Sequence, residues 1–384
     1  MRVLLVTDSL TPTYGWGRYA IGLVRALRRQ RVDFTLLSPR RLCTVPDLAA
    51  LPDHGEVTSF VSETRRLPRL VAANTLPIRR ALATCDLVHC ITEPYAIPAA
   101  LACGRKPLVV TLHGTYAVRP FTRWAERPWY ELAYRRASRL LPVSTFTRRL
   151  LPPRFRTAKT SVVPEGVDVT AFDLPAGDAA ASRPGGTAPY LLSVGPIKRR
   201  KGYRHTVEAF ARVHARRPDV RYRIVGGIDD RVLMEELRSR IAALGLQDAV
   251  EFLGRVSEAE LVRLYHGCAA MWLLPVDDDL QFEAFGLVYW EANAAGRPTI
   301  GARSSGAEDA IVDGVTGFLV PASDAAAAAG AALRLLDDPA LATRMGAAGR
   351  AHVRPWDDAA RLVGEHYLDL VGGGRPPVVA TGVA

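Results

Sequence analysis

The sequence predicts an α/β protein of two domains, each built on a parallel sheet covered by helices. Short apolar runs rich in β-branched residues alternate with amphipathic segments, and this alternation stops once and then starts again. The length agrees, because 384 residues exceed what one hydrophobic core usually holds. With 48% hydrophobic and 23% charged residues, the composition is that of an ordinary globular protein and permits two packed cores.

The first alternation covers residues 1–170, which we interpret as the first domain. Segments such as 18–30 have the apolar spacing of amphipathic helices. Between such segments, buried parallel strands are expected at 2–8, 33–38, 86–91, 107–113 and 139–144.

The alternation pauses at 171–188, a stretch rich in Pro, Gly and Ala that is expected to form a linker. A second domain is expected over 189–355, with strands at 189–195, 220–227, 249–254, 269–275 and 297–302. Within it the Ala-rich run 322–336 is expected to be a surface helix. A last helix is expected at 356–371, and 372–384 is expected to be a disordered tail. Two such Rossmann-like halves imply a ligand cleft between them, lined by the carboxyl ends of the strands.

Charge is concentrated in the first half of the chain. Residues 1–175 hold 26 Lys and Arg against 13 Asp and Glu, a net of +13, whereas the remainder holds 24 against 26, a net of −2. A one-sided positive field concentrates anionic partners, whether nucleic acid, anionic lipid or a phosphorylated substrate. No recognised nucleic-acid motif is present.

The N-terminus and the cysteines indicate the compartment. No apolar run reaches the roughly 18 residues that span a bilayer, and no signal peptide is expected. The five cysteines are an odd number without C-x-x-C spacing, so they are expected to be reduced, structural thiols. The chain is therefore expected in the cytoplasm.

Several polar residues follow the expected strands. Gly15 and Gly17 lie between the first strand and a helix, where backbone can approach a phosphate, although most Gly-x-Gly pairs are only turns. His113 ends a strand and precedes a glycine, so a catalytic and a structural role stay equally open. Gly195 and Gly202 bracket a loop with four cations, which suits either an anion site or a solvated turn.

The segment "QFEAFGLVYWEANAAG" (281–296) carries two carboxylates, Glu283 and Glu291, eight residues apart. In one continuous helix they would lie about 12 Å apart along the axis, so they could not share one proton or metal. The pattern instead predicts a loop with Glu283, a turn at Gly286 and a helix from near Leu287, with Glu291 in its second turn. Such a helix start suits an anion.

Taken together, these motifs resemble the retaining glycosyltransferases of family 4. The second half carries the E-x7-E motif of that family as Glu283 and Glu291. It is accompanied in order by "GWGRY", "TLHG", "VSTFTRR", "PEGVD", "KG", "FLGRV" and "DGVTGFLV". The resemblance implies the GT-B architecture, two Rossmann-like domains facing across a cleft, with the C-terminal helix returning to the N-terminal domain. It also implies an acceptor-binding first domain and a second domain that binds the nucleotide sugar.

The resemblance also implies roles for single residues. In such enzymes Glu291 would bind the ribose hydroxyls, Glu283 would lie beside the transferred sugar, and Lys201 would neutralise the diphosphate leaving group. Backbone N–H groups of Phe285, Gly286 and Leu287 would contact sugar and phosphate, and the base would lie near Arg255 and Val256. His113 would touch the sugar from the first domain, while Gly15, Gly17 and Gly195 would let backbone approach the ligand.

Two features depart from the family pattern. Pro196 stands where relatives usually carry a phosphate-binding arginine, and Arg200 is our choice for the cation that replaces it. The run Asp277-Asp278-Asp279 imitates a metal-binding D-x-D motif, but GT-B sites use cationic side chains and helix ends, so we expect no metal site and no cofactor beyond the nucleotide sugar as co-substrate.

The expected activity is transfer of a hexosyl group from a UDP- or GDP-linked sugar to an acceptor hydroxyl on a glycan, a lipid or a small molecule. A nucleotide-sugar epimerase, a phosphorylase of the same fold, and a catalytically silent membrane- or nucleic-acid-binding relative are the alternatives. The arginine-aromatic stretch 119–139 is read either as a soluble helical hairpin or as an interfacial segment that docks on an anionic membrane and brings the enzyme to its inner face.

Overall fold

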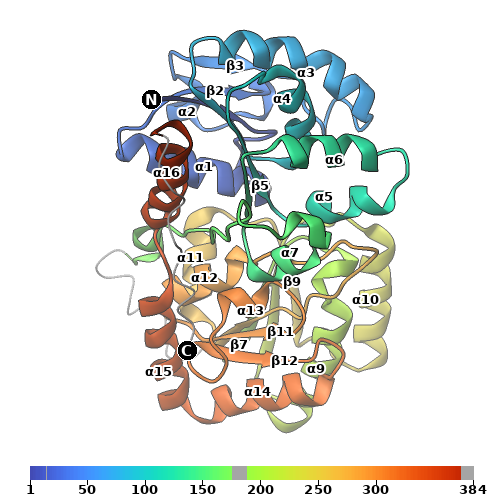
Figure 1. The fold of residues 1–384 in the computed structure, drawn as a ribbon. Helices are drawn as coiled ribbons and strands as arrows, with labels where there is room; N and C mark the ends of the chain where they lie inside the picture. Colours follow the sequence, from blue (N-terminus) through green and yellow to red (C-terminus); the bar gives the residue numbers. More distant parts are fainter. Residues whose placement is uncertain (14, 175–187, 373–384) are drawn as a thin grey trace. The chain divides into compact units, whose positions relative to one another are not determined.

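The computed structural model describes residues 1–13, 15–174 and 188–372, and these form two compact units (Figure 1). The first unit comprises Met1–Gly166 together with the chain from Pro355 onward, and the second comprises Val167–Arg354. The chain thus leaves the first unit at 166, where the sequence predicts a boundary at 170. Most of the expected linker, 175–187, and the expected tail from 373 lie outside the described residues.

The first unit is built on a six-stranded parallel sheet with the order β3-β2-β1-β4-β5-β6. Its central strands are buried on both faces, which explains their continuous apolar sequence. The strands are β1 (Arg2–Val6), β2 (Asp33–Ser38), β3 (His54–Glu56), β4 (Leu87–Cys90), β5 (Leu108–Leu112) and β6 (Arg139–Pro142).

Helices connect these strands and cover the sheet (Figure 1). They are α1 (Gly15–Arg29), α2 (Pro46–Ala49), α3 (Leu67–Leu82), α4 (Ala96–Ala102), α5 (Thr115–Val118), α6 (Arg127–Arg136), α7 (Thr145–Leu150) and α16 (Trp356–Gly372). Short 3₁₀ turns are η1 (Arg40–Leu42), η2 (Glu93–Tyr95), η3 (Arg119–Thr122) and η4 (Pro153–Phe155).

The C-terminal helix α16 belongs to the first unit, which confirms its expected return. Trp356 packs so closely on α1 that a Cβ at Gly22 would lie 2.1 Å from the indole Cε2. Further along α16, the Tyr367 hydroxyl lies 2.5 Å from His89 Nδ1 on β4, and Asp369 forms an ion pair with Arg139 on β6. These contacts tie the last helix to both α1 and the sheet.

The second unit repeats the architecture with a parallel sheet of the order β12-β11-β10-β7-β8-β9. Its strands are β7 (Tyr190–Val194), β8 (Arg221–Val225), β9 (Val250–Gly254), β10 (Ala270–Trp272), β11 (Thr299–Ala302) and β12 (Gly317–Val320). Around it lie η5 (Val169–Phe172), η6 (Arg199–Lys201), α9 (Tyr203–Arg216), α10 (Arg231–Ala243), α11 (Glu258–Gly267), α12 (Leu287–Ala294), α13 (Ala307–Ala310), α14 (Ala325–Asp337) and α15 (Pro339–His352).

The structure corrects the predicted elements in three places. Each sheet has one edge strand that was not predicted, β3 and β12, because runs of three and four residues give too little alternation to detect. The predicted strands are shorter at their carboxyl ends, where residues such as Asp8 and His113 already belong to loops. The Ala-rich helix α14 is not merely a surface helix, since one of its faces, including Leu335, is buried and packs on α9.

Candidate active site

In the second unit a cationic turn follows β7 and leads into α9. Arg199–Lys201 form the 3₁₀ turn η6, which ends at Gly202 in a left-handed conformation with φ +72°. A Cβ at Gly202 would lie 1.6 Å from the Leu274 carbonyl oxygen, so only glycine fits there. This turn directs Lys201 into the protein, where its side chain is 7% exposed.

Lys201 and Arg200 converge on one carboxylate, that of Glu283. Lys201 Nζ lies 2.6 Å and an Arg200 terminal nitrogen 2.9 Å from the same oxygen, Glu283 Oε2. Burial acts to raise the pKa of the Glu283 carboxyl, but the charges and hydrogen bonds of Lys201 and Arg200 outweigh burial and lower that pKa to about 2. Burial also lowers the pKa of Lys201, although Glu283 opposes this. Two cations on one carboxylate leave a net positive charge, which suits an anionic ligand.

Glu283 is followed by the start of α12, as the sequence predicts. Gly286 precedes the helix with φ +87°, Leu287 is its first residue, and Glu291 lies in its second turn. Each of the backbone N–H groups of 285–287 lacks a backbone acceptor among the described residues. The expected loop, turn and helix are therefore confirmed, and the helix start carries N–H groups that can bind an anion.

Glu291 is buried on α12 and held by a neighbouring helix. The Tyr265 hydroxyl on α11 donates to Glu291 Oε2 over 2.7 Å. The Tyr265 ring in turn packs edge to face on Phe172 of η5 at a centroid distance of 5.8 Å. Phe285 is also buried, and its ring meets Trp290 at 4.7 Å. These contacts fix the side chains on both sides of the helix start.

The remaining predicted residues of this unit lie at the carboxyl ends of β7 and β9. A Cβ at Gly195 would lie 3.3 Å from Lys201 Cε, which places this glycine beside the buried lysine. A Cβ at Gly227 would lie 2.9 Å from Arg255 Nε, and the Gly227 carbonyl accepts the N–H of Ile197 over 2.8 Å. Arg255 is exposed and Val256 half-buried. This edge thus joins the loop after β7 to Arg255.

The aspartate run forms a tight turn. Asp279 and Leu280 have φ of +52° and +60°, and Asp278 and Gln281 exchange backbone hydrogen bonds of 3.1 and 3.0 Å. Among the described residues no group of three or more His, Cys, Asp or Glu side chains could hold a metal ion. Residues 278–281, which include two aspartates of the run, thus have the geometry of a hairpin turn.

The first unit carries the other predicted residues at the carboxyl edge of its own sheet. Gly17 packs against Thr11, whose carbonyl oxygen would lie 1.9 Å from a Cβ, whereas a Cβ at Gly15 would meet open space among the described residues that are not its chain neighbours. His113 follows β5, and its ring meets the Tyr19 ring of α1 edge to face at 4.4 Å. Burial lowers the pKa of His113 to about 4, so its imidazole is neutral at pH 7.

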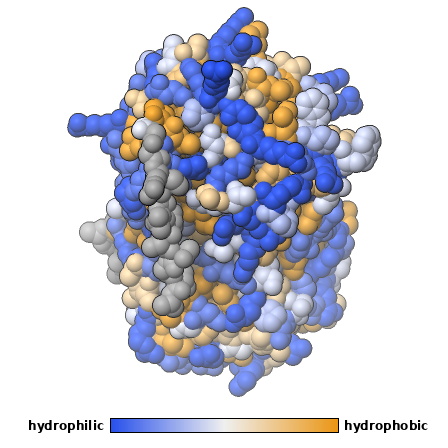
Figure 2. Space-filling view, in the orientation of Figure 1, coloured by the Kyte–Doolittle hydropathy of each residue, from blue (hydrophilic) through white to orange (hydrophobic). Residues whose placement is uncertain are grey.

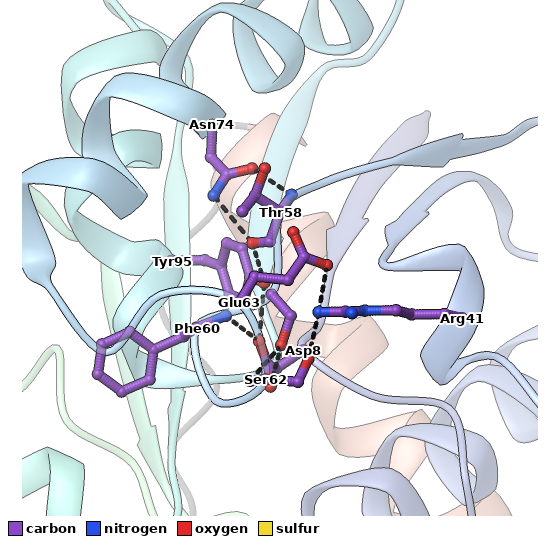
Figure 3. Close-up of polar contacts among 9 residues, drawn as sticks. Asp8, Arg41, Thr58, Phe60, Ser62, Glu63, Asn74 and Tyr95 are labelled. Atoms are coloured by element: carbon purple, nitrogen blue, oxygen red, sulfur yellow. Dashed lines mark hydrogen bonds and ion pairs between the residues drawn. The ribbon is translucent and has the colours of Figure 1, made fainter.

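Two buried carboxylates at this edge were missed by the sequence reasoning. Asp8 follows β1 and accepts hydrogen bonds from the Phe60 N–H, the Ser59 hydroxyl and the Tyr95 hydroxyl, as Figure 3 shows for part of this cluster. Glu93 follows β4 and accepts the backbone N–H of His113 over 2.6 Å. Their position after strands was the only signal in the sequence, because burial cannot be read from single acidic residues.

The Asp8 cluster holds one loop in place. Asn74 on α3 bonds both backbone groups of Thr58, and Arg41 reaches Ser62 and Glu63, so the loop after β3 is fixed from several sides (Figure 3). That loop presents Phe60, whose ring lies 5.4 Å from the ring of Tyr116.

Comparison with known proteins places this geometry in a family. Residues 178–352 match the family described as "Glycosyl transferases group 1", and residues 14–171 match "Glycosyltransferase Family 4". The GDP-mannose-dependent alpha-(1-6)-phosphatidylinositol monomannoside mannosyltransferase of Mycolicibacterium smegmatis is 32% identical over 265 residues, 66% of this chain and 67% of that protein. The glycogen synthase of Mycobacterium tuberculosis is 30% identical over an alignment of 417 positions that covers 98% of this chain and 97% of that protein.

Solved structures share the fold. The Anabaena protein HepE in complex with UDP-glucose superposes with a TM-score of 0.78 at 20% identity, covering 96% of this chain and 99% of that chain. Sucrose-phosphate synthase of Thermosynechococcus elongatus gives 0.78 at 22% identity, covering 97% and 100%. The same family is indicated by the two units with parallel six-stranded sheets, by the E-x7-E carboxylates and by these matches. The chain belongs to the glycosyltransferases of family 4 and has their GT-B fold of two Rossmann-like domains.

Proposed function

We propose that this glycosyltransferase is a retaining enzyme that moves a hexosyl group from a nucleoside diphosphate sugar to an acceptor hydroxyl. The observation that carries the proposal is the cluster of half-buried Arg200 with buried Lys201 and Glu283 beside the start of α12. A buried group with net positive charge next to free helix N–H groups is suited to a diphosphate.

Each part of the cluster has a task in this proposal. Negative charge grows on the leaving diphosphate as the glycosidic bond breaks, so Lys201 and Arg200 stabilise the transition state more than the ground state. Glu291 binds the ribose hydroxyls. N–H groups of Phe285, Gly286 and Leu287 contact sugar and phosphate, while the base lies near Arg255 and Val256.

The retaining course is supported by the state of Glu283. A carboxylate whose pKa is about 2, bonded to two cations, is a weak base and a weak nucleophile. We therefore assign Glu283 to positioning the cations and the sugar. In this proposal an oxygen of the leaving phosphate takes the proton of the acceptor hydroxyl, which attacks on the face that the phosphate leaves. Neither a metal nor a cofactor takes part.

UDP and GDP are the proposed donor nucleotides. The relatives include two GDP-mannose-dependent mannosyltransferases, and the HepE structure contains UDP-glucose. An epimerase or a phosphorylase of the same fold remains the alternative enzyme. The acceptors named for the relatives, phosphatidylinositol monomannoside and D-inositol 3-phosphate, are both anionic, and an anionic or lipid-linked acceptor also suits the net charge of +13 in the first 175 residues.

The helix α6 supports docking of the first unit on an anionic membrane. Trp124 is 89% exposed in the loop before α6, and Trp129 and Leu132 are more than 40% exposed on it. Arginines flank these side chains at 119, 123, 127 and 135. Figure 2 shows hydrophobic patches among hydrophilic residues over α3 and α4 of the same unit. Exposed tryptophans with arginines at phosphate level are typical of an interfacial segment, and no helix among the described residues is long and apolar enough to cross a bilayer.

Two measurements test the proposed function. Thermal unfolding with UDP, GDP and ADP tests the donor site, because a nucleotide at 100 times its dissociation constant stabilises the fold by about 2.7 kcal/mol. Transfer of labelled sugar, with the anomeric configuration of the product read by NMR, tests the reaction. Absence of any shift with every nucleotide, or an inverted product, would contradict the proposal.

A further inference from the structure

Glu93 is a buried carboxyl in direct contact with the backbone of His113. It begins η2, three positions after the last residue of β4, and it is 0% exposed. Its Oε1 accepts the His113 N–H over 2.6 Å, and the Gly114 N–H also acts on the carboxyl. Its other oxygen, Oε2, is buried without a hydrogen-bond partner among the described residues. One carboxyl thus binds the His113 N–H at the end of β5 and lies beside the next N–H, that of Gly114.

The segment 91–93 holds the ring of His113 as well as its backbone. The ring Nε2 lies 2.8 Å from the Ile91 carbonyl oxygen, which can only accept, so Nε2 carries the hydrogen and Nδ1 is the acceptor of the neutral ring. Gly114 follows with φ +132° and ψ −110°, a conformation that only glycine adopts readily. The hydrogen bond from the His113 N–H to Glu93 therefore helps to fix a turn that requires glycine.

We propose that Glu93 is a positioning residue for His113, and that its carboxylate form holds the His113–Gly114 turn in the conformation needed for sugar transfer. This inference rests on the proposed function, together with the contact between His113 and the transferred sugar that the family resemblance implies. Glu93 itself touches no substrate, because its side chain is fully buried. The prediction is that the rate of transfer follows the ionisation of this carboxyl.

The ionisation state matters because the two forms bind N–H groups with different strength. A carboxylate accepts charge-assisted hydrogen bonds that are about twice as strong as those to a neutral acid. Burial raises the pKa of Glu93 to about 7, although the N–H groups of Glu93 itself, His113 and Gly114 act in the opposite direction. The carboxyl is therefore ionised above pH 7 and neutral below it.

Three buried phenols and the imidazole of His113 lie near Glu93 and are uncharged near neutral pH. Tyr116 on α5 and Tyr130 and Tyr134 on α6 face it, and burial raises the pKa of all three phenols. Burial lowers the pKa of His113 to about 4. Asp8, which also acts on Tyr116, has a pKa raised by burial. The helix α4 has no titratable side chain. The three arginines of α3, Arg69, Arg79 and Arg80, are exposed. The charge of Arg119 acts on Tyr116 and Tyr130. Among Glu93, the three phenols and His113, Glu93 is thus the group that changes charge near pH 7.

The experiment measures transfer from pH 5.5 to 8.5 by wild type, Glu93→Gln and Glu93→Ala. We expect the wild-type kcat to rise about tenfold as pH increases, with the midpoint of this rise near pH 7. Glu93→Gln keeps an acceptor oxygen without a titrating proton, so its kcat should be independent of pH in this range. Glu93→Ala should lose tenfold or more in kcat at every pH, while KM for the nucleotide sugar changes less than twofold, because the residues proposed to bind the nucleotide lie in the second unit. Asp8→Asn removes another buried carboxyl, which does not contact His113. This variant should show the same rise of kcat with pH as wild type.

A measurement without catalysis separates this inference from the proposed function. In protein labelled with ¹⁵N-histidine, which has eight histidines, the backbone amide signal of His113 should titrate near pH 7 in wild type and stay constant in Glu93→Gln. Titration of that signal without any transfer activity would refute the proposed function and leave the contact between Glu93 and His113 in place. If both the rise of kcat with pH and the titration of the His113 amide signal persist in Glu93→Gln, the positioning role is overturned. A kcat of Glu93→Ala equal to that of wild type would also overturn the positioning role. If Glu93→Gln fails to fold, a wild-type His113 amide signal that does not titrate near pH 7 overturns it equally.

Discussion

The Arg200 guanidinium lies 2.9 Å from Glu283 Oε2, the oxygen that Lys201 contacts at 2.6 Å. Arg200 also approaches the Phe282 carbonyl at 3.3 Å, so its side chain is turned inward although Pro196 occupies the place of the usual arginine. The neighbouring Arg199 instead pairs with Asp230 and Glu236. This difference between adjacent arginines makes a matched comparison available.

Arg200→Lys should lower kcat about tenfold or more, because lysine cannot reproduce a planar two-point contact with carboxylate and phosphate. Arg199→Lys should stay within about twofold of wild type. Steady-state kinetics and a thermal melt of both variants check this. Equal, near-normal activity of the two would remove Arg200 from the proposed site.

Lys201→Ala should depress turnover more than nucleotide affinity, since its charge acts mainly on the leaving diphosphate. Wild-type transfer should be unchanged by EDTA, because the proposed charge neutralisation uses side chains and N–H groups. Initial rates with and without chelator, each repeated with added manganese, test this. Loss of activity in EDTA that manganese restores would show a metal site and contradict the proposal.

Tyr265→Phe should weaken nucleotide binding several-fold, because Glu291 loses the hydroxyl that orients it. Tyr190→Phe is the control, as its hydroxyl donates to the Leu264 carbonyl over 2.7 Å and serves no predicted site residue. Both variants should lose about 1 kcal/mol of stability. Titration calorimetry with UDP or GDP should separate them, and equal affinities would argue that Tyr265 is only structural.

Replacing Trp124 and Trp129 by serine should reduce flotation with anionic vesicles, because both rings are exposed beside arginines. Wild-type recovery should fall in high salt, which screens the attraction. Val232→Ser is the control, since Val232 is 65% exposed on α10 of the second unit. Equal recovery with neutral and anionic vesicles would contradict membrane docking.

Glu93 should also make stability depend on pH. Its pKa is raised from 4.5 in the reference state to about 7 in the folded protein, so between these values the folded state holds a proton that the unfolded chain releases. Stability should therefore fall as pH rises from 4.5 to 7, by up to about 3 kcal/mol relative to Glu93→Gln. Urea unfolding of both proteins at pH 5, 6, 7 and 8 measures the difference. Parallel curves would show that Glu93 is not perturbed.

The sequence was informative where several residues act in a fixed local pattern. The loop with Glu283, the turn at Gly286 and the helix with Glu291 could be predicted because glycine, carboxylates and apolar spacing all indicate the same structure. Asp8 and Glu93 could not, because their burial depends on loops from distant parts of the chain. Their partners, Phe60 and His113, are 52 and 20 residues away. Tertiary contacts of this range leave no local signal.

The return of α16 to the first unit has a consequence for synthesis of the chain. On the ribosome, residues up to 166 emerge without Trp356, Tyr367 and Asp369, whose contacts with α1, β4 and β6 complete that unit. At roughly 5–20 residues per second, about 10–40 s pass before these residues are made. The intervening residues 167–354 emerge as one uninterrupted stretch and can fold first. The first unit is thus completed after the second, and its Tyr19, Gly22 and His89 surfaces stay uncovered until α16 has been synthesised.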